Sequence, residues 1–196
     1  MYTTTKQTDG RTMRDIWVIS DTHFRHANIL KFRGSDGNLV RPGFADVDAM
    51  DEHMIECWNS VVKNGDIVYH LGDVVMNSGD NYAWFKKNWS RLNGSKRLIV
   101  GNHDDIKFLS AGGFFKKVSM WRMFPEFGLL LSHVPIHSAS AMMYGSKDSG
   151  LLKTPFQLLN VHGHIHQNPS PEGPYRNVSV EAINYTPVNI EELRIK

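Results

Sequence analysis

Short apolar runs that end in Asp, Asn or His are the feature that most restricts the fold of this 196-residue chain. The run at 16–20 (IWVIS) leads into Asp21 and His23, and the run at 67–71 leads across one glycine to Asp73. Runs of this length and composition predict buried strands. Loops that follow neighbouring strands converge at the carboxyl ends of a sheet, which is where ligands bind. The pattern therefore predicts a sheet with a polar site along one edge.

The same pattern recurs three more times along the chain, which contains ten histidines. The remaining polar clusters are Asn102-His103-Asp104 after the run at 97–100, His133 after the run at 128–132, and His164 and His166 after the run at 158–162. A single Asp-x-His or Gly-Asp pair is most often an ordinary turn. An ordered series of such clusters, each at a strand end, indicates a metal site.

The rest of the sequence fits an α/β protein. Helical spacing of apolar residues predicts helices over 46–62 and 81–92. Further strands are expected at 117–124, 176–180 and 187–190. Strand and helix alternate in the first half and strands dominate the second, which predicts two packed sheets with helices outside. We expect a flexible leader over 1–14, with an edge strand as the alternative, and one domain over 15–196. A long connection at 138–155 is expected to border the site.

Composition excludes several other classes of protein. Cys57 is the single cysteine, so a Cys-rich zinc site is excluded and a reducing, cytoplasmic location is expected. No apolar stretch approaches the roughly 18 to 20 residues that cross a bilayer, so we expect no membrane partner. The formal net charge of +2 does not by itself call for a nucleic-acid partner.

The ordered clusters resemble the calcineurin-like metallophosphoesterase superfamily. Its small bacterial and phage members are the most similar, through the blocks DTHF at 21–24, HANI at 26–29, YHLGD at 69–73 and NVSVE at 177–181. The similarity extends from about Ile16 to Leu193. It implies a four-layer α/β/β/α sandwich of two mixed sheets flanked by helices. The one departure is Ile165, where members often carry a small polar residue that is not a ligand.

The resemblance also implies a ligand set for two metal ions. Asp21, His23 and His166 would bind one ion, Asn102, His133 and His164 would bind the other, and Asp73 would bridge them. Two neighbouring cations repel each other, which is why a shared carboxylate is expected. Oxygen and nitrogen ligands without thiolate suit Mn²⁺, our first choice, or Fe, Zn, Co or Ni.

One alternative in this ligand set concerns the histidines near residue 164. Alternating residues of an extended segment point the same way, so the pair His162 and His164 competes with the pair His164 and His166. Gly163 directly before His164 matches the family's Gly-His-x-His pattern and favours the second pair.

Two more residues are expected to take part in catalysis. The resemblance implies that a hydroxide bridging the metals attacks the phosphorus and that His103 protonates the leaving oxygen. Asp104 would orient the His103 ring and hold its proton.

The expected activity is hydrolysis of a small phosphate ester, a diester before a monoester, with a nucleotide among the candidates. Two rivals stay open, a nuclease and a catalytically silent binding module on the same fold. The nuclease rests on the clustered cations Lys31, Arg33 and Arg41. Further candidates for the substrate pocket are Arg25, His26, Asn28 and His137. The sequence does not indicate an oligomeric state.

Overall fold

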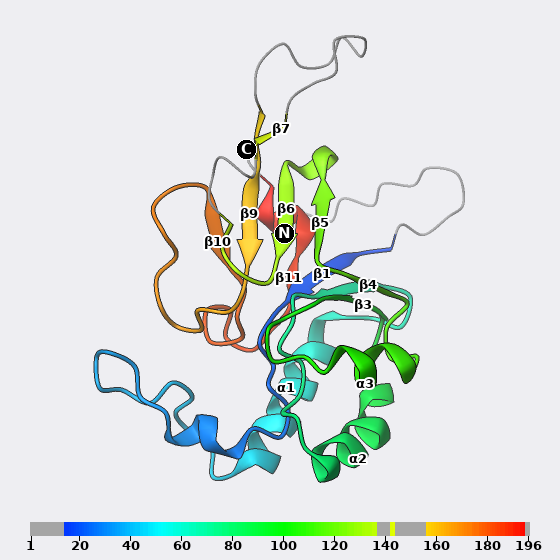
Figure 1. The fold of residues 1–196 in the computed structure, drawn as a ribbon, viewed down its shortest axis with the longest axis vertical. Helices are drawn as coiled ribbons and strands as arrows, with labels where there is room; N and C mark the ends of the chain where they lie inside the picture. Colours follow the sequence, from blue (N-terminus) through cyan, green and yellow to red (C-terminus); the bar gives the residue numbers. More distant parts are fainter. Residues whose placement is uncertain (1–13, 137–141, 144–155, 195–196) are drawn as a thin grey trace.

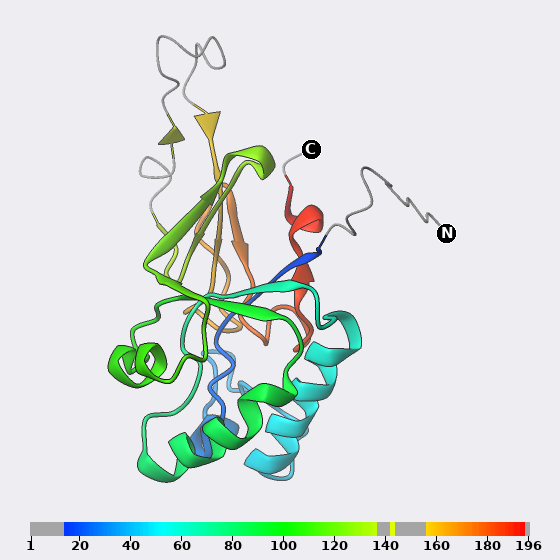
Figure 2. The same cartoon turned by 90° about the vertical axis from the view of Figure 1, so that its right-hand side faces the viewer.

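Two β-sheets pack against each other, and the α-helices lie on the far side of the first sheet (Figures 1 and 2). The computed structural model describes residues 14–136, 142–143 and 156–194. The first sheet has the order β11 (Val188–Asn189), β1 (Ile16–Ile19), β2 (Ile67–His70), β3 (Ser95–Ile99) and β4 (Lys117–Ser119). The second has the order β10 (Tyr175–Asn177), β9 (Leu159–His162), β6 (Leu129–Ser132) and β5 (Trp121–Phe124). A separate two-stranded pair joins β7 (Met142–Met143) to β8 (Phe156–Gln157).

Both sheets contain parallel and antiparallel neighbours. Strands β1 to β4 pair in parallel, whereas β11 runs antiparallel to β1. In the second sheet β6 and β10 are parallel to β9, and β5 is antiparallel to β6. Since parallel neighbours need crossover connections, several helices and loops are placed between consecutive strands. The expected pair of mixed sheets with flanking helices is confirmed.

Among the described residues, three α-helices and several short 3₁₀-helices lie between or after the strands. The helices are α1 (Val47–Val61), α2 (Gly79–Asn88) and α3 (Ile106–Ala111), with 3₁₀ turns η1 (Ala27–Lys31), η2 (Trp89–Arg91), η3 (Pro125–Phe127) and η5 (Ile190–Leu193). Helix α1 begins where the Asp46 carboxylate accepts a hydrogen bond from the backbone N–H of Ala49, an N-cap of the usual kind. Helix α2 starts two residues before the expected position, and the last turn expected for it is η2.

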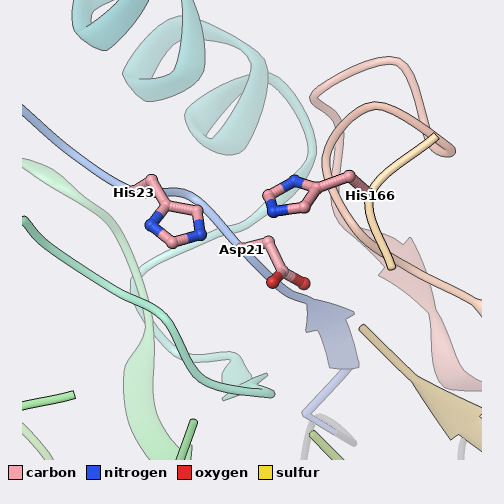
Figure 3. A group of neighbouring side chains, drawn as sticks. All are labelled: Asp21, His23 and His166. Atoms are coloured by element: carbon pink, nitrogen blue, oxygen red, sulfur yellow. The ribbon is translucent and has the colours of Figure 1, made fainter. Parts of the chain in front are cut away.

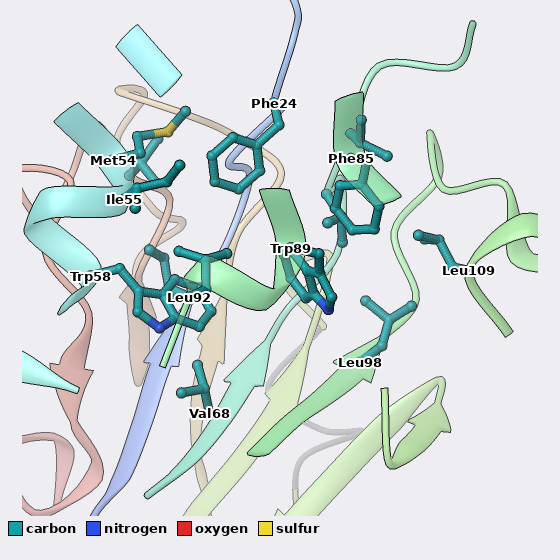
Figure 4. Packing of buried hydrophobic residues seen from close by; sticks show 14 of the residues in the cluster. Phe24, Met54, Ile55, Trp58, Val68, Phe85, Trp89, Leu92, Leu98 and Leu109 are labelled. Carbon is teal, nitrogen blue, oxygen red and sulfur yellow. The ribbon is translucent and has the colours of Figure 1, made fainter. Parts of the chain in front are cut away.

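The largest core cluster fills the space between the helices and the first sheet (Figure 4). Aromatic rings dominate it: Phe85 stacks on Trp89 at 4.6 Å, and Trp58 meets Trp89 edge to face at 6.3 Å between ring centroids. A second cluster lies between the two sheets. In β1, Ile19 belongs to the first cluster and its neighbour Val18 to the second. Burial on both faces explains why the central strands are continuous apolar runs.

The fourth layer of the expected sandwich would be a layer of helices on the outer face of the second sheet. The α-helices of the described residues all contribute side chains to the cluster against the first sheet. The second sheet instead has a small satellite cluster of Leu130 and Leu158, with Met123 and Ile136 packed against it. Within the described residues, no α-helix therefore covers the outer face of the second sheet.

The strand expected over 117–124 is two strands in different sheets. Strand β4 pairs with β3 in the first sheet, whereas β5 pairs with β6 in the second. The chain crosses between the sheets at Met120, which is 65% exposed. A continuous β-type pattern gives no sign of this crossing, because both halves remain extended.

Other expectations lie partly outside the described residues. The leader at 1–14 and the connection at 138–155 are mostly in the undescribed ranges, so the domain division stays a prediction. Helix α3 was not expected, because its six residues are too few to show a period. None of the helices in the described ranges has the length and apolar character that crossing a bilayer requires.

Replacing Trp58 with alanine is expected to lower the free energy of unfolding by about 3 to 5 kcal/mol. Trp58 is 1% exposed, and its indole N–H donates to the Asn93 carbonyl at 3.0 Å, so the variant leaves both a cavity and an unpaired acceptor. Urea denaturation measures the loss. The matched control is Trp121→Ala, where a 54% exposed indole should matter by no more than about 0.5 kcal/mol. Equal losses in the two variants would contradict this description of the core.

Candidate metal centre

The predicted ligands gather where strands of both sheets end. Asp21 and His23 follow β1, Asp73 follows β2 and Asn102 follows β3. The other three, His133, His164 and His166, follow strands β6 and β9 of the second sheet. The centre is therefore assembled from the carboxyl ends of parallel strands in two sheets, in agreement with the position that the sequence predicts.

One group, called site A, consists of Asp21, His23 and His166 (Figure 3). One ligand atom from each of these residues lies within 4.8 Å of the others. The His23 and His166 rings stack at 5.3 Å between centroids with an interplanar angle of 22°. Asp21 and His23 are buried, whereas His166 is partly exposed.

A second group, called site B, consists of Asp73, His133 and His164, again with ligand atoms within 4.8 Å of one another. Asn102 joins this group, because its Oδ1 lies 2.9 Å from His133 Nε2. Asp73 Oδ2 is 3.5 Å from Nε2 of both His23 and His133, so this carboxylate lies between the two sites. All seven predicted ligands are thus brought together, and their metal-binding roles stay a prediction.

Unpaired atoms in the centre fit metal ions. Asp21 Oδ1 and His23 Nε2 are buried and have no hydrogen-bond partner among the described residues. Leaving such atoms unpaired costs about 1 to 3 kcal/mol each, so native proteins rarely do it. His133 Nδ1 lies 2.7 Å from the Leu71 carbonyl, which only accepts, so Nδ1 carries the proton. A neutral His133 then turns the lone pair of Nε2 toward Asn102 Oδ1, and a cation between the two would satisfy both.

Burial favours the neutral form of two predicted histidine ligands, whereas for His166 the effect of burial is outweighed by Glu181 and Asp21, which raise its pKa. Burial lowers the pKa of His23 below its ordinary value, and the nearby charge of Arg41 lowers it further. Burial also lowers the pKa of His164, with a contribution from His133. Neutral imidazoles are the form that binds metal.

The ligands are presented by an unusual backbone. Positive φ angles occur at Asp21 (59°), His23 (45°), Asp73 (56°), His164 (70°) and His166 (52°). Each non-glycine residue in this region costs roughly 1 to 3 kcal/mol, and such residues cluster at functional sites.

This backbone corrects the expectation for the histidines near residue 164. His164 and His166 lie in left-handed conformations, not in an extended segment. They belong to the two separate groups that the resemblance implies. His162 belongs to neither group; it is buried at the end of β9 and its Nε2 pairs with Ser170 Oγ at 3.0 Å. The parity argument was therefore wrong, because the segment is not extended, and the pair His164 and His166 stays a prediction.

Close backbone approach explains two glycines of the motifs. A Cβ on Gly101 would lie 2.3 Å from Asp73 Oδ1, and a Cβ on Gly163 would lie 2.1 Å from Asp21 Oδ2. Any side chain at either position would displace a predicted ligand.

Asp104 does not orient the His103 ring as expected. Its carboxylate accepts backbone hydrogen bonds from Asp73 at 3.1 Å, Val74 at 2.9 Å and Gly101 at 2.8 Å. Asp104 therefore fixes the turn that carries Asp73 against the turn after β3. His103 is exposed, and its own backbone N–H donates to Asp73 Oδ1 at 2.9 Å.

Arg41 is a structural residue and not the surface cation that the nuclease hypothesis requires. It is 1% exposed, and its guanidinium donates to the carbonyls of Thr22 at 2.8 Å and Asp21 at 2.5 Å. Its Nε donates to Glu181 Oε1 at 2.7 Å. Arg41 thus fixes the backbone of the turn that carries Asp21 and His23.

Glu181 supports site A directly and was not singled out in the sequence. Its side chain is 3% exposed, and its Oε1 lies 3.0 Å from His166 Nδ1. Burial alone would raise the pKa of Glu181, but Arg41 and His166 bring it below its ordinary value, so the carboxylate is charged. The His166 Nδ1–H then donates to Glu181 and leaves Nε2 free to bind metal. The only signal in the sequence was its place at the end of the NVSVE block.

His70 connects the turns that carry Asp21 and Asp73. It is fully buried, its Nε2 lies 2.9 Å from Thr22 Oγ1, and its Nδ1 accepts from the Gly72 N–H at 3.2 Å. Burial lowers the pKa of His70 to about 3, so the ring is neutral. His70 is thus a packed supporting residue.

The other pocket candidates divide clearly. His26 lines the cavity beside site A together with His23 and His103. Arg25 instead pairs with Asp48 and Asp51 and does not line this cavity. Asn28 is exposed and does not line this cavity, and His137 lies outside the described residues.

Comparisons with known proteins agree with the geometry. A family model described as calcineurin-like phosphoesterase matches residues 14–191. An uncharacterized protein of Methanocaldococcus jannaschii, MJ1445, is 36% identical over 187 residues, which cover 92% of this chain and 89% of that protein. The Gene 66 protein of Mycobacterium phage L5 is 28% identical over 174 residues, 79% of this chain and 78% of that one. The crystal structure of AQ665, a protein of unknown function from Aquifex aeolicus, has a TM-score of 0.64 and 26% identity, and the match covers 92% of this chain and 98% of AQ665.

Replacing Glu181 with glutamine is expected to weaken Mn²⁺ binding about 10- to 100-fold. The neutral amide no longer fixes the proton on His166 Nδ1, so Nε2 is less well oriented and less basic. Isothermal titration calorimetry with Mn²⁺ measures the affinity.

The control for this variant is Asp66→Asn. Asp66 is also buried, accepts from Trp17 Nε1 at 3.0 Å, and precedes β2 at the end of the strand opposite the centre. The control should lose stability and keep its Mn²⁺ affinity. Equal affinities in both variants and the wild type would show that Glu181 does not support a metal ligand.

Proposed function

Because the chain belongs to the calcineurin-like phosphoesterase family, we propose that it hydrolyses a small phosphate ester with two divalent metal ions. A diester is proposed before a monoester, Mn²⁺ before Fe, Zn, Co or Ni, and the cytoplasm as the location. The observation that carries the proposal is the pair of ligand groups that meet at Asp73.

Two adjacent sites support hydrolysis better than a structural role. Structural zinc sites usually close around one ion with four ligands. Here three residues of site A, three of site B and Asn102 face one another, and His164 is exposed. When bound, two divalent ions would supply Lewis-acid activation of the phosphate and of the attacking water.

His103 is proposed as the residue that protonates the leaving oxygen. Its ring centroid lies 5.8 Å from that of His23, and both rings line the same cavity. The backbone bond from His103 to Asp73 keeps the imidazole next to the centre. A histidine in this position can give its ring proton to a departing alkoxide.

The rival reading is a binding module that does not catalyse. A binding module does not need a metal-binding residue at every ligand position of the motifs, nor an exposed histidine beside them. In this chain every one of these positions carries a residue that can bind metal, and His103 is exposed. The nuclease is disfavoured because Arg41 is buried, while Arg33 is tied to the Gly37 carbonyl at 2.7 Å.

Metal-stripped protein is expected to hydrolyse bis-p-nitrophenyl phosphate only after Mn²⁺ is restored. The rate with p-nitrophenyl phosphate gives the preference between diester and monoester. Release of nitrophenolate, followed by absorbance, measures both. Absence of turnover with every divalent metal, in a protein that binds two ions, would favour the binding module.

Replacing His103 with asparagine is expected to lower kcat about 10²- to 10⁴-fold, because the general acid is lost. Its imidazole is not among the predicted ligands, so calorimetry should still give the wild-type Mn²⁺ affinity. A fall in metal affinity equal to the fall in rate would assign His103 to metal binding.

A further inference from the structure

A cavity of about 550 Å³ opens beside site A, much larger than a phosphate group needs. One side of it is formed by the centre itself, through His23, His103 and His166. The rest of the lining includes an apolar wall of Ile29, Phe32 and Val40, with Arg33 and Ser35 next to it in the sequence. A phosphate on the centre would leave this apolar wall in contact with water, so the wall fits the organic group of the ester.

The apolar wall belongs to an arm, residues 27–40, which is the blue segment that extends from the body in Figure 1. The arm contains η1 and a turn closed by the bridge between Arg33 and Leu39. It is packed closely on the segment after His166, because a Cβ on Gly34 would lie 2.7 Å from Gln167 Nε2. The cavity therefore lies between two parts of the chain that are far apart in sequence.

Aromatic rings lead from the centre to this wall. The His26 ring lies 5.5 Å from the His23 ring, and the Phe32 ring lies 5.5 Å from His26 at an interplanar angle of 85°. Because His26 meets Phe32 edge to face, it does not stack on it. Phe32 is 49% exposed, whereas Ile29 beside it is 2% exposed. Phe32 is thus separated from the His23 ring of the centre by the His26 ring alone, and its exposed phenyl ring is suited to stack with a flat ligand.

Polar side chains complete the cavity. Gln167 and Asn168 are exposed and line it, as does Ser35. Amides and hydroxyls both donate and accept hydrogen bonds, so they can pair with the edge of a heterocycle. An apolar surface with a few polar groups at its edge is the usual composition of a small-molecule site.

We propose that this cavity binds the base of a nucleotide, which stacks on Phe32 while its phosphate lies at the metal centre. The inference rests on the proposed function, because it requires a phosphate ester at the centre. A long alkyl chain fits less well, since Gln167, Asn168 and Ser35 would lose water without gaining partners.

The test compares the binding of three phosphates to the Mn²⁺-loaded full chain by calorimetry. Adenosine 5′-monophosphate has the base, ribose 5-phosphate lacks it, and hexyl phosphate replaces it with an alkyl chain. The wild type is expected to bind adenosine monophosphate about tenfold more tightly than ribose phosphate, a modest value for one stacked base. Phe32→Ala should remove this preference and Phe32→Tyr should keep it.

The matched control is Trp121→Ala, which removes another half-exposed aromatic ring that does not line this cavity. Its preference should equal that of the wild type. The inference is overturned if the wild type binds the first two ligands equally, if hexyl phosphate binds as tightly as the nucleotide, or if Phe32→Ala keeps the preference.

Hydrolysis assays separate this inference from the proposed function. If the protein prefers the nucleotide through Phe32 but cleaves no ester, the proposed base site is supported and the proposed phosphoesterase activity is contradicted. If the protein cleaves esters but shows no preference for the base, the proposed phosphoesterase activity is supported and the proposed base site is contradicted.

Discussion

The rest of this structure depends on one constraint: several side-chain oxygen and nitrogen atoms with free lone pairs must be held close together. Asp73 lies 3.5 Å from a nitrogen of His23 and from a nitrogen of His133, which come from different sheets. Asp21 Oδ1 and His23 Nε2 are buried and find no partner among the described residues. Such an arrangement is costly without cations. The two sheets, the left-handed turns and the close glycines all serve to hold it.

The surrounding network supplies order and a compensating charge. Arg41 binds the carbonyls of the site A turn and the carboxylate of Glu181, which in turn fixes His166. Asp104 holds the turns of Asp73 and Gly101 together through backbone N–H groups. Each strained ligand is therefore fixed by contacts from another element, as preorganised sites require.

Site A adjoins the cavity beside the arm at 27–40, where apolar and polar groups are mixed. The ligands are positioned by rigid strand ends, whereas the arm is an irregular segment. The predicted ligands and the arm are thus on different parts of the chain, so the arm can vary without disturbing the predicted ligands.

The sequence by itself determined the residue types of the centre, their order and their place at strand ends, because apolar periodicity and motif spacing are local properties. It also indicated two sheets with helices. Tertiary structure alone decided how His164 and His166 are presented, since their backbone is left-handed and not extended. The same holds for Arg41 and Glu181, which are 140 residues apart and meet only when the sheets pack. The crossing at Met120 was hidden for the same reason: pairing partners are chosen in space, and no local pattern records them.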